Sequence, residues 1–322
     1  MSLNPGPCPT MVAVCVCTCR RPEGLARLLE RLALAGLGTL APGHDVRLVV
    51  VDNAPDGRAE LLCAQHRPRL GVPLTFAVEP VRGISMARNR AVATALDLGA
   101  DLLAFIDDDD LPEPDWLVRL LERQCQTGAE LVFGLASAPL DLAVPSWLHG
   151  LNDFRPRSLD PLNRYGLPAA AGSCNVLLHR RLVEALSVDG VLFLPELALT
   201  GGSDSELFVR ARRQGFRTAT APLSRVVTGA DSGRQTLRGV LRRHYRYGTS
   251  QVAVASRHLD AAELRRMRAG ARRKLAKAAW RIPLALASPP VLVARLAEFA
   301  RSLGKLASFR GRRYRYYGDG TG

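Results

Sequence analysis

The sequence predicts an α/β fold in which helices flank a mostly parallel sheet, with a basic helical extension at the C-terminal end. Three observations lead to this prediction. Between residues 11 and 126, short apolar runs alternate with amphipathic segments of helical period. The apolar runs lack the polar alternation of a half-exposed strand, which favours strands buried on both faces. Lys and Arg are concentrated after residue 231, which sets the last part of the chain apart.

The expected strands and helices follow one another through short connections, as in βαβ units. Ser85 and Ser203 are predicted to be helix N-caps, because a serine hydroxyl there accepts hydrogen bonds from free N–H groups. We expect strands at residues 11–18, 46–51, 74–78, 102–106, 131–135 and 175–178. We expect helices at about 23–35, 58–66, 83–98, 115–126, 236–256 and 261–279, and a further one that starts near 203.

The 322 residues divide by charge into two predicted regions. Residues 1–231 carry 23 Lys/Arg and 26 Asp/Glu, whereas residues 232–322 carry 21 and 4. Hydrophobic residues make up 47% of the chain, which is enough for a sizeable core. We therefore expect one domain over residues 1–231 and a basic helical region over residues 232–322.

The sequence is typical of a cytoplasmic protein. Its seven cysteines include no CxxC pair, and Cys15, Cys17 and Cys19 alternate along one apolar strand, as buried small side chains do. Residues 1–10 lack the basic and apolar regions of a secretory signal. No uninterrupted apolar run reaches the roughly 18 residues of a membrane-spanning helix.

Four consecutive carboxylates, Asp107 to Asp110, directly follow the apolar run at residues 102–106. They are expected at the carboxyl edge of the sheet, where open α/β sheets bind ligands. Four like charges this close together are costly unless a cation offsets them, and oxygen ligands favour Mg2+ or Mn2+. The alternative is an acidic surface turn, because Asp is common in turns and two prolines follow.

Two further carboxylates are expected to lie near this run: Asp52 ends the second strand, and Asp204 is in the first turn of a helix. Together the three positions meet the needs of sugar transfer from a nucleotide diphosphate. The leaving diphosphate needs a divalent cation, and the acceptor hydroxyl needs a carboxylate base near the anomeric carbon. The alternative for Asp204 is a residue that stabilises the helix dipole.

Short motifs occur along the chain in a characteristic order. They are Thr18-Cys19-Arg20, Val51-Asp52-Asn53, Gly83 through Arg88-Asn89, Phe105 through Asp109 with Pro112 and Trp116, Asn175, and Gly201 through Leu207. In this order and spacing they resemble the family 2 glycosyltransferases, which are inverting enzymes of the GT-A fold. The similarity is greatest to the branch that includes a succinoglycan-type glucosyltransferase, and it covers about residues 11–230.

The resemblance implies a role for each matching residue of the donor site. Asp52 is expected to contact the nucleotide base, with Thr18 and Arg20 in the same pocket. Arg88 and Asn89 are expected to lie against the donor. The implied DxD pair is Asp107 and Asp109, with Asp107 and its neighbour Asp108 on the donor side and Asp109 on the metal. The register stays open, because Asp108 and Asp110 have the same spacing.

The resemblance implies that Asp204 is the catalytic base, which takes the proton of the acceptor hydroxyl as this attacks the anomeric carbon. The chain departs from the family pattern next to it, because Ser203 stands where a Glu is usual. This departure concerns contacts with the acceptor rather than the base. Further along, residues 226–229 lack the His that serves many relatives as another metal ligand.

The predicted activity is metal-dependent, inverting transfer of a sugar from a nucleotide-diphosphate sugar, expected to be UDP-linked, with Mg2+ or Mn2+. The acceptor is expected to be a saccharide or a lipid-linked saccharide in the synthesis of cell-surface polysaccharide or glycolipid. One alternative is a sugar-1-phosphate nucleotidyltransferase, which needs a Gly-rich phosphate loop where residues 19–22 read CRRP. Another is a non-catalytic basic adaptor on an inactive transferase scaffold.

The basic region leaves three interpretations open. It could dock on the anionic cytosolic face of the inner membrane, with the apolar residues 282–287 and 291–296 in the interface. It could bind nucleic acid, which the near-neutral charge of residues 1–231 disfavours. It could also consist of solvated helices that pack on the core.

Overall fold

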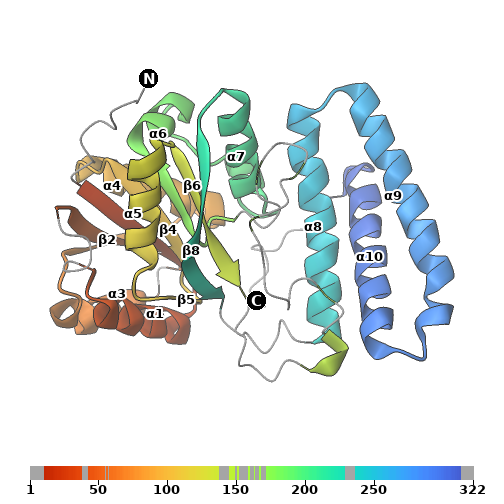
Figure 1. Ribbon diagram of the computed structural model, residues 1–322, viewed down its shortest axis with the longest axis horizontal. Helices are drawn as coiled ribbons and strands as arrows, with labels where there is room; N and C mark the ends of the chain where they lie inside the picture. The colour runs from red at the N-terminus through yellow and green to blue at the C-terminus, as the bar shows by residue number, and fades with distance from the viewer. Residues whose placement is uncertain are drawn as a thin grey trace. The chain divides into compact units, whose positions relative to one another are not determined.

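The computed structural model describes residues 11–37, 43–54, 56, 58–137, 145–148, 151, 159, 163, 167, 172–228 and 236–312. The chain forms two compact units (Figure 1). Unit 1 comprises Met1–Ser137, Arg157–Ala198 and Ser203–Gly229. Unit 2 comprises Ala138–Pro156, Leu199–Gly202 and Ala230–Gly322. The functional division after residue 231 stays a prediction.

Unit 1 contains an eight-stranded sheet with the order β3-β2-β1-β4-β7-β6-β8-β5. The four strands from β3 to β4 are parallel, as the buried apolar runs predict. Beyond β4 the sheet is mixed, because β7 and β5 run antiparallel to their neighbours. The predicted α/β fold class is confirmed. The strands are β1 (Met11–Thr18), β2 (Asp45–Asp52), β3 (Leu74–Val78), β4 (Leu102–Asp107), β5 (Asp110–Pro112), β6 (Leu131–Ser137), β7 (Val176–His179) and β8 (Thr218–Thr228).

Helices cover both faces of this sheet (Figure 1). Val12, Val14 and Val16 of β1 lie in one core cluster with leucines of α1 and α5, and α4 contacts β1 and β2. Successive strand residues point to opposite faces of a sheet. Val132 of β6 belongs to that cluster, and its neighbour Phe133 packs edge-on against Phe208 of α7 on the other face. The helices are α1 (Pro22–Ala35), α3 (Arg58–His66), α4 (Ile84–Asp97), α5 (Trp116–Thr127), α6 (Arg180–Leu186) and α7 (Ser203–Arg213), with 3-10 turns η1 (Arg67–Arg69) and η4 (Pro195–Leu197).

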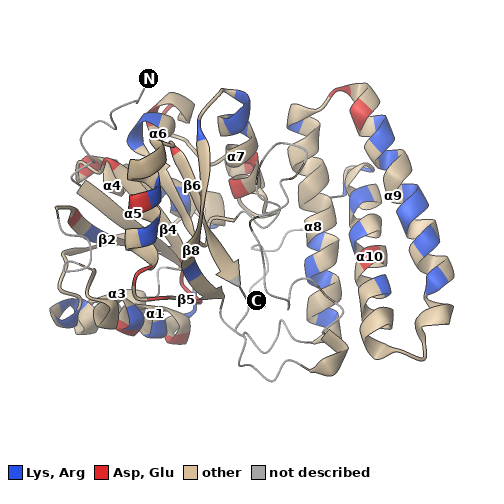
Figure 2. Cartoon of the chain, viewed as in Figure 1, with Lys and Arg blue, Asp and Glu red and all other residues tan. Residues whose placement is uncertain are grey.

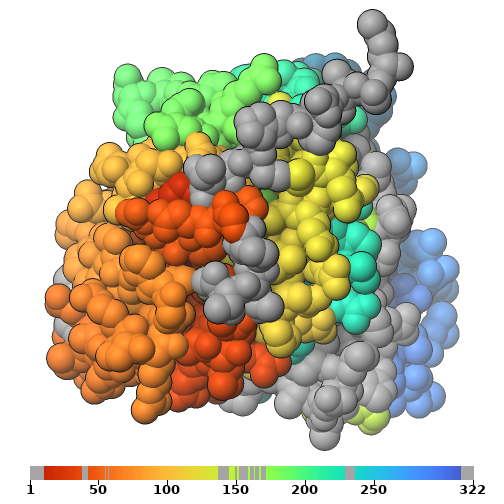
Figure 3. Space-filling model, turned by 60° about the vertical axis from the view of Figure 1, so that its left-hand side comes forward, coloured from red at the N-terminus to blue at the C-terminus, as the bar shows by residue number. Residues whose placement is uncertain are grey.

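The core cluster joins segments that are far apart in sequence. It combines β1 and β2 with Trp116 of α5 and Val226 of β8. In the space-filling view the N-terminal segments, red to orange, lie directly against the yellow segment that contains α5 (Figure 3). This packing fixes the ends of β1, β2 and β4 in position relative to one another.

Two predicted N-caps are wrong by one or two residues. The N-cap of α4 is Gly83, and Ser85 lies inside the first turn with its hydroxyl buried. Gly83 has φ of 139°, and a Cβ there would lie 2.6 Å from the Cβ of Ala198. Asn53 fixes this turn, because its Oδ1 accepts a hydrogen bond from Gly83 N at 2.7 Å. Ser203 is the first residue of α7 rather than its cap.

Unit 2 is helical in its described part. Thr236 caps α8, and Asp260 forms a capping box with Glu263 at the start of α9. Helices α8 and α10 approach closely at Gly248 and Gly304, where an added Cβ would collide with backbone of the facing helix. The elements are α8 (Leu237–His258), α9 (Ala261–Arg281), α10 (Pro289–Ser308) and the 3-10 turns η2 (Ser146–Leu148) and η6 (Pro283–Ala285).

The apolar residues of unit 2 only partly follow the sequence prediction. Val293, which one of the three interpretations places at a membrane interface, is buried with Val240 and Ala297 in a small core. This core also explains α10, a helix that the sequence analysis did not predict. None of the helices in the described part of the chain combines the length and the apolarity that crossing a membrane requires.

Candidate active site

The carboxyl ends of three adjacent strands place the predicted residues together. In the parallel register Thr18 lies beside Asp52, and Cys17 lies beside Asp107. Because β2, β1 and β4 are neighbours, their ends form one edge of the sheet. The prediction that Asp52 and the acidic run share an edge is therefore borne out by the topology.

A cavity of about 360 Å³ opens at this edge, and its lining includes Thr18, Arg20 and Asp52. Asp52 Oδ1 accepts a hydrogen bond from Ala54 N at 2.8 Å. Burial raises the pKa of Asp52, and the bond from Ala54 opposes this rise. Arg20 has a positive φ of 55°, which is unusual for a residue other than glycine. The three residues predicted for the base pocket thus line one cavity.

The four aspartates divide between a strand end, a turn and the next strand. Asp107 ends β4, and Asp110 begins β5. Asp108 is buried and accepts hydrogen bonds from Thr18 Oγ1 at 2.7 Å and from Arg21 Nη1 at 3.3 Å. Burial raises the pKa of Asp108 to about 6, although Arg21 and Thr18 both favour its ionised form. Arg21 Nη1 also lies 3.2 Å from Asp109 Oδ2.

A second group of side chains, which includes the first and the last aspartate of the acidic run, has the character of a metal site. One ligand atom each of Asp107, Asp110 and Cys174 lies within 4.8 Å of the others. Two carboxylates suit Mg2+ or Mn2+, and a thiolate is a softer ligand of the kind that transition metals accept. Asp109, the predicted metal residue, lies outside this group and stays a prediction. Cys174 was not considered, because only oxygen ligands were expected.

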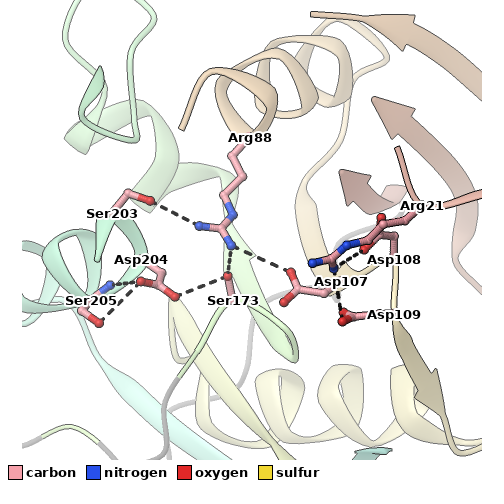
Figure 4. A network of polar contacts seen from close by, with 9 residues as sticks. All are labelled: Arg21, Arg88, Asp107, Asp108, Asp109, Ser173, Ser203, Asp204 and Ser205. Carbon is pink, nitrogen blue, oxygen red and sulfur yellow. Dashed lines mark hydrogen bonds and ion pairs between the residues drawn. The ribbon is translucent and has the colours of Figure 1, made fainter. Parts of the chain in front are cut away.

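Arg88, near the start of α4, connects the acidic run to the start of α7 (Figure 4). It is only 7% exposed, and its Nη2 lies 3.8 Å from Asp107 Oδ1. The same guanidinium donates to Ser173 Oγ through Nη2 and to Ser203 Oγ through Nη1, the latter at 3.3 Å. A buried planar cation of this kind holds several oxygens in a defined relative position.

Asp204 is reached from Arg88 through Ser173 (Figure 4). Ser173 Oγ donates to Asp204 Oδ2 at 3.5 Å, and Ser205 N donates to Asp204 Oδ1 at 2.7 Å. The structure therefore brings together Asp107, Arg88 and Asp204, three of the residues singled out in the sequence. Ser173 was missed, because it lies in an irregular segment before β7 with no motif of its own.

Asn89 has a different environment from the other predicted donor residues. Its Nδ2 donates to Phe193 O at 2.8 Å, and its Oδ1 accepts from Leu192 N at 3.1 Å and Phe193 N at 2.8 Å. These bonds hold the segment that places Phe193 under the Arg88 guanidinium, 5.6 Å from the ring centre. A contact between Asn89 and the donor stays a prediction, and its present bonds favour a supporting role.

Comparisons with known proteins identify similar sequences. The family model described as "Glycosyl transferase family 2" matches residues 13–186. The succinoglycan biosynthesis protein ExoM of Rhizobium meliloti (strain 1021) is 33% identical over 233 residues, which cover 72% of this chain and 71% of the relative.

Solved structures of TarS from S. aureus are similar in fold. The crystal structure of TarS 1-349 has a TM-score of 0.50 at 13% identity and covers 95% of this chain and 93% of that chain. The longer TarS structure has a TM-score of 0.50 at 14% identity, with 97% of this chain and 60% of that chain covered. At such low identity the likeness concerns the fold alone, and it agrees with the expected GT-A fold.

Proposed function

We propose, from the premise that the chain belongs to glycosyl transferase family 2, that it moves a sugar from a nucleotide diphosphate to an acceptor hydroxyl with inversion at the anomeric carbon. The glycosyltransferase class follows from the family, whereas the donor, the inversion and the metal are the proposal. One observation carries it: Arg88 and Ser173 connect Asp204 to the carboxylate that ends β4.

A uridine diphosphate sugar is the donor that we propose. The cavity beside β1 offers the carboxylate of Asp52, which as an anion only accepts hydrogen bonds. Uracil presents a ring N–H donor, as guanine does, whereas adenine and cytosine present an unprotonated ring nitrogen at the corresponding edge. Thr18 and Arg20 of the same cavity are polar groups suited to a ribose or a phosphate.

We propose a divalent cation, Mn2+ or Mg2+, at Asp107 and its neighbours Asp110 and Cys174, with Asp109 as the alternative ligand from the sequence. Bound there, the cation would offset the negative charge of the leaving diphosphate. The chain's own contribution is to hold the carboxylates of the acidic run in place: Arg88 lies 3.8 Å from Asp107, and Arg21 binds Asp108 and Asp109.

Asp204 is the proposed general base. Its Oδ1 is oriented by Ser205 N at 2.7 Å, whereas Oδ2 makes only the longer contact to Ser173 at 3.5 Å. We therefore assign Oδ2 as the atom that receives the acceptor proton. The acceptor oxygen then attacks the anomeric carbon on the face opposite the diphosphate, which inverts the configuration.

The proposed acceptor is a saccharide, free or carried on a lipid, in the synthesis of a surface polysaccharide. The name of the relative, a succinoglycan biosynthesis protein, supports this class of product. A lipid-carried acceptor would require the enzyme to work at the cytosolic face of a membrane, to which the basic region of residues 232–322 is suited.

Donor binding with and without metal tests the proposal. A panel of nucleotide sugars is screened by thermal shift with Mn2+ or with EDTA, since a ligand raises apparent stability by mass action. We expect a UDP-sugar to raise Tm only with metal, and NMR of the transfer product to show the inverted anomer. Retention of configuration, or a stabilisation that EDTA does not change, would contradict the proposal.

The metal position is tested by three single variants with Mn2+ titrations. Asp110→Asn and Cys174→Ser are expected to weaken Mn2+ binding by about tenfold or more, whereas Asp109→Ala keeps it. The opposite result would move the metal to Asp109 and make Arg21 its competitor for that carboxylate. Arg21→Ala serves as the control that releases Asp109 from its ion pair without removing a carboxylate.

A further inference from the structure

The longest run of unpaired positive charge in the described part of the chain lies on α9. This helix has eight Lys/Arg and one acidic residue, Glu263. Arg266, Arg273 and Lys277 are exposed and share one face, because their spacings of seven and four residues match the helical repeat. Figure 2 shows this row of basic residues along α9.

These cations have no anionic partner among the described residues. No ion pair joins Arg266, Arg273 or Lys277 to any carboxylate in the part of the chain that the structure describes. The opposite side of α9 carries the buried residues Ala271 and Ala278 and packs on α10. The basic face of α9 is therefore exposed to solvent, while the opposite face of the helix packs on α10.

An exposed apolar tip follows directly after the basic face. Trp280 is 78% exposed, and Leu284 and Leu286 around η6 are 75% and 67% exposed. Trp280 continues the face of Lys277, three residues earlier. Large apolar side chains gathered at one end of a helix unit, next to a basic face, are typical of a binding surface.

We infer that the α9 face and this tip together form a docking surface for a bilayer that contains anionic lipid. The cations match the negative phosphates of the headgroups, which gives long-range attraction. Tryptophan prefers the interface between headgroups and acyl chains, and the two leucines can enter the acyl region. The inference refines the membrane part of the proposed function by naming the residues that make the contact.

A lipid surface fits this chemistry better than a nucleic acid does. A strand of RNA would use the same cations and could stack one base on Trp280. Leu284 and Leu286 have no aromatic face for a base, so their exposure would remain unexplained. A bilayer accounts for the cations, the tryptophan and both leucines at once.

Vesicle sedimentation of the full chain, without donor or acceptor, tests this surface. We expect strong binding to phosphatidylcholine vesicles with about 30% phosphatidylglycerol, weak binding to phosphatidylcholine alone, and a loss as salt rises. Arg266→Glu with Arg273→Glu should weaken the first by about tenfold or more. Leu284→Ser with Leu286→Ser should weaken it several-fold while leaving the salt dependence in place.

Matched controls come from exposed residues of unit 1. Arg67→Glu with Arg69→Glu makes the same charge reversal, and Leu61→Ser removes a leucine that is 66% exposed. Both controls should bind vesicles like the wild type. Trp280→Phe should abolish the blue shift of tryptophan emission that anionic vesicles induce, because Trp116 is buried in the core of unit 1 and Trp147 packs against the small core of unit 2.

Three outcomes would overturn the inference. The first is equal binding of the wild type to both kinds of vesicle, and the second is retention of vesicle binding by the α9 double variant. The third is a wild type that binds RNA but not vesicles, with the RNA binding lost in the α9 double variant. UDP-sugar hydrolysis in solution separates this result from the enzymatic proposal. The α9 variant should keep that hydrolysis, whereas failure of hydrolysis in the wild type would count against the enzyme and leave the vesicle result unaffected.

Discussion

Charged side chains are arranged in opposite ways in the two compact units. In unit 1 two arginines at the candidate site contact carboxylates: Arg21 lies between Asp108 and Asp109, and Arg88 lies near Asp107. In unit 2 helix α9 carries a row of basic residues (Figure 2), of which the exposed Arg266, Arg273 and Lys277 form no ion pair with any described carboxylate. The difference indicates that the ion pairs of unit 1 fix the positions of side chains at the candidate site, whereas the exposed cations of α9 are available to bind an anionic partner.

The backbone packing of the two units differs in a similar way. Unit 1 is built on a sheet whose strand ends place the polar residues. Unit 2 is built on a close crossing of α8 and α10 at two glycines, which leaves α9 on the outside of that pair as a support for surface residues. Substitutions that break an ion pair of the candidate site in unit 1 should therefore lower activity. Substitutions in unit 2 should instead lower stability or membrane binding.

The largest effect is expected from Asp204→Asn. The amide cannot accept the acceptor proton, so kcat should fall by about 10²–10⁴-fold while the Kd for the donor is kept. Steady-state kinetics and donor titration measure the two quantities. Asp97→Asn, an exposed residue at the end of α4, is the control and should change neither. Weaker donor binding with a normal kcat would contradict the role of Asp204 as the general base.

The second effect concerns Arg88→Lys. Lysine keeps the charge but loses the planar fork that reaches Ser173 and Ser203 together, so we expect kcat to fall by about 10²-fold with a smaller change in KM. Arg90→Lys on the exposed side of α4 is the matched control. A variant that loses stability but keeps kcat would show that Arg88 serves the fold alone.

The third effect is a pH dependence that Asp108→Asn should remove. Burial raises the pKa of Asp108 to about 6 from its ordinary value of 3.8, so the folded state binds this proton more tightly than the unfolded state. Asp108 therefore favours folding most at low pH, and its contribution declines as pH rises from about 4 to 6, by up to about 3 kcal/mol.

Denaturant unfolding of the wild type and Asp108→Asn at pH 4.5 and 7 measures this linkage. The free energy of unfolding of the variant relative to the wild type should increase between the two pH values. A difference that is independent of pH would show that Asp108 stays ionised throughout, held by Arg21 and Thr18.

The smallest effect is expected from Gly248→Ala in unit 2. The new methyl group would collide with the backbone of Arg301, so the free energy of unfolding should fall by about 1–3 kcal/mol. Gly270→Ala in α9 has open space around it and should instead stabilise by about 0.5–1 kcal/mol. Equal effects of the two substitutions would mean that α8 and α10 do not rely on this close approach.

Much of unit 1 could be predicted from local patterns. The expected strand at residues 74–78 coincides with β3, and the expected ranges for β1 and β2 agree within one residue at each end. Such apolar runs are unambiguous, because a strand covered on both faces tolerates no polar alternation. In contrast, β8 carries several polar residues and a register shift opposite Gly134 and Leu135, so its sequence gives no clear period.

The candidate site divides in the same way. Asp52, Asp107 and Asp204 are visible in the sequence because each stands at the end of a strand or the start of a helix. Arg21, Ser173 and Cys174 are not, because their roles depend on partners far along the chain.

The sequence by itself determined the alternation of strands and helices from β1 to β4, the separation of a near-neutral part from a basic part, and the carboxylates that we propose for the chemistry. Only the tertiary structure decided which groups hold those carboxylates. The physical reason is range: periodicity and turn preferences act over a few residues, whereas the contacts of Arg88 with Ser173 and Ser203 span 85 and 115 positions. Contacts of that span exist only once the sheet has brought its strand ends together.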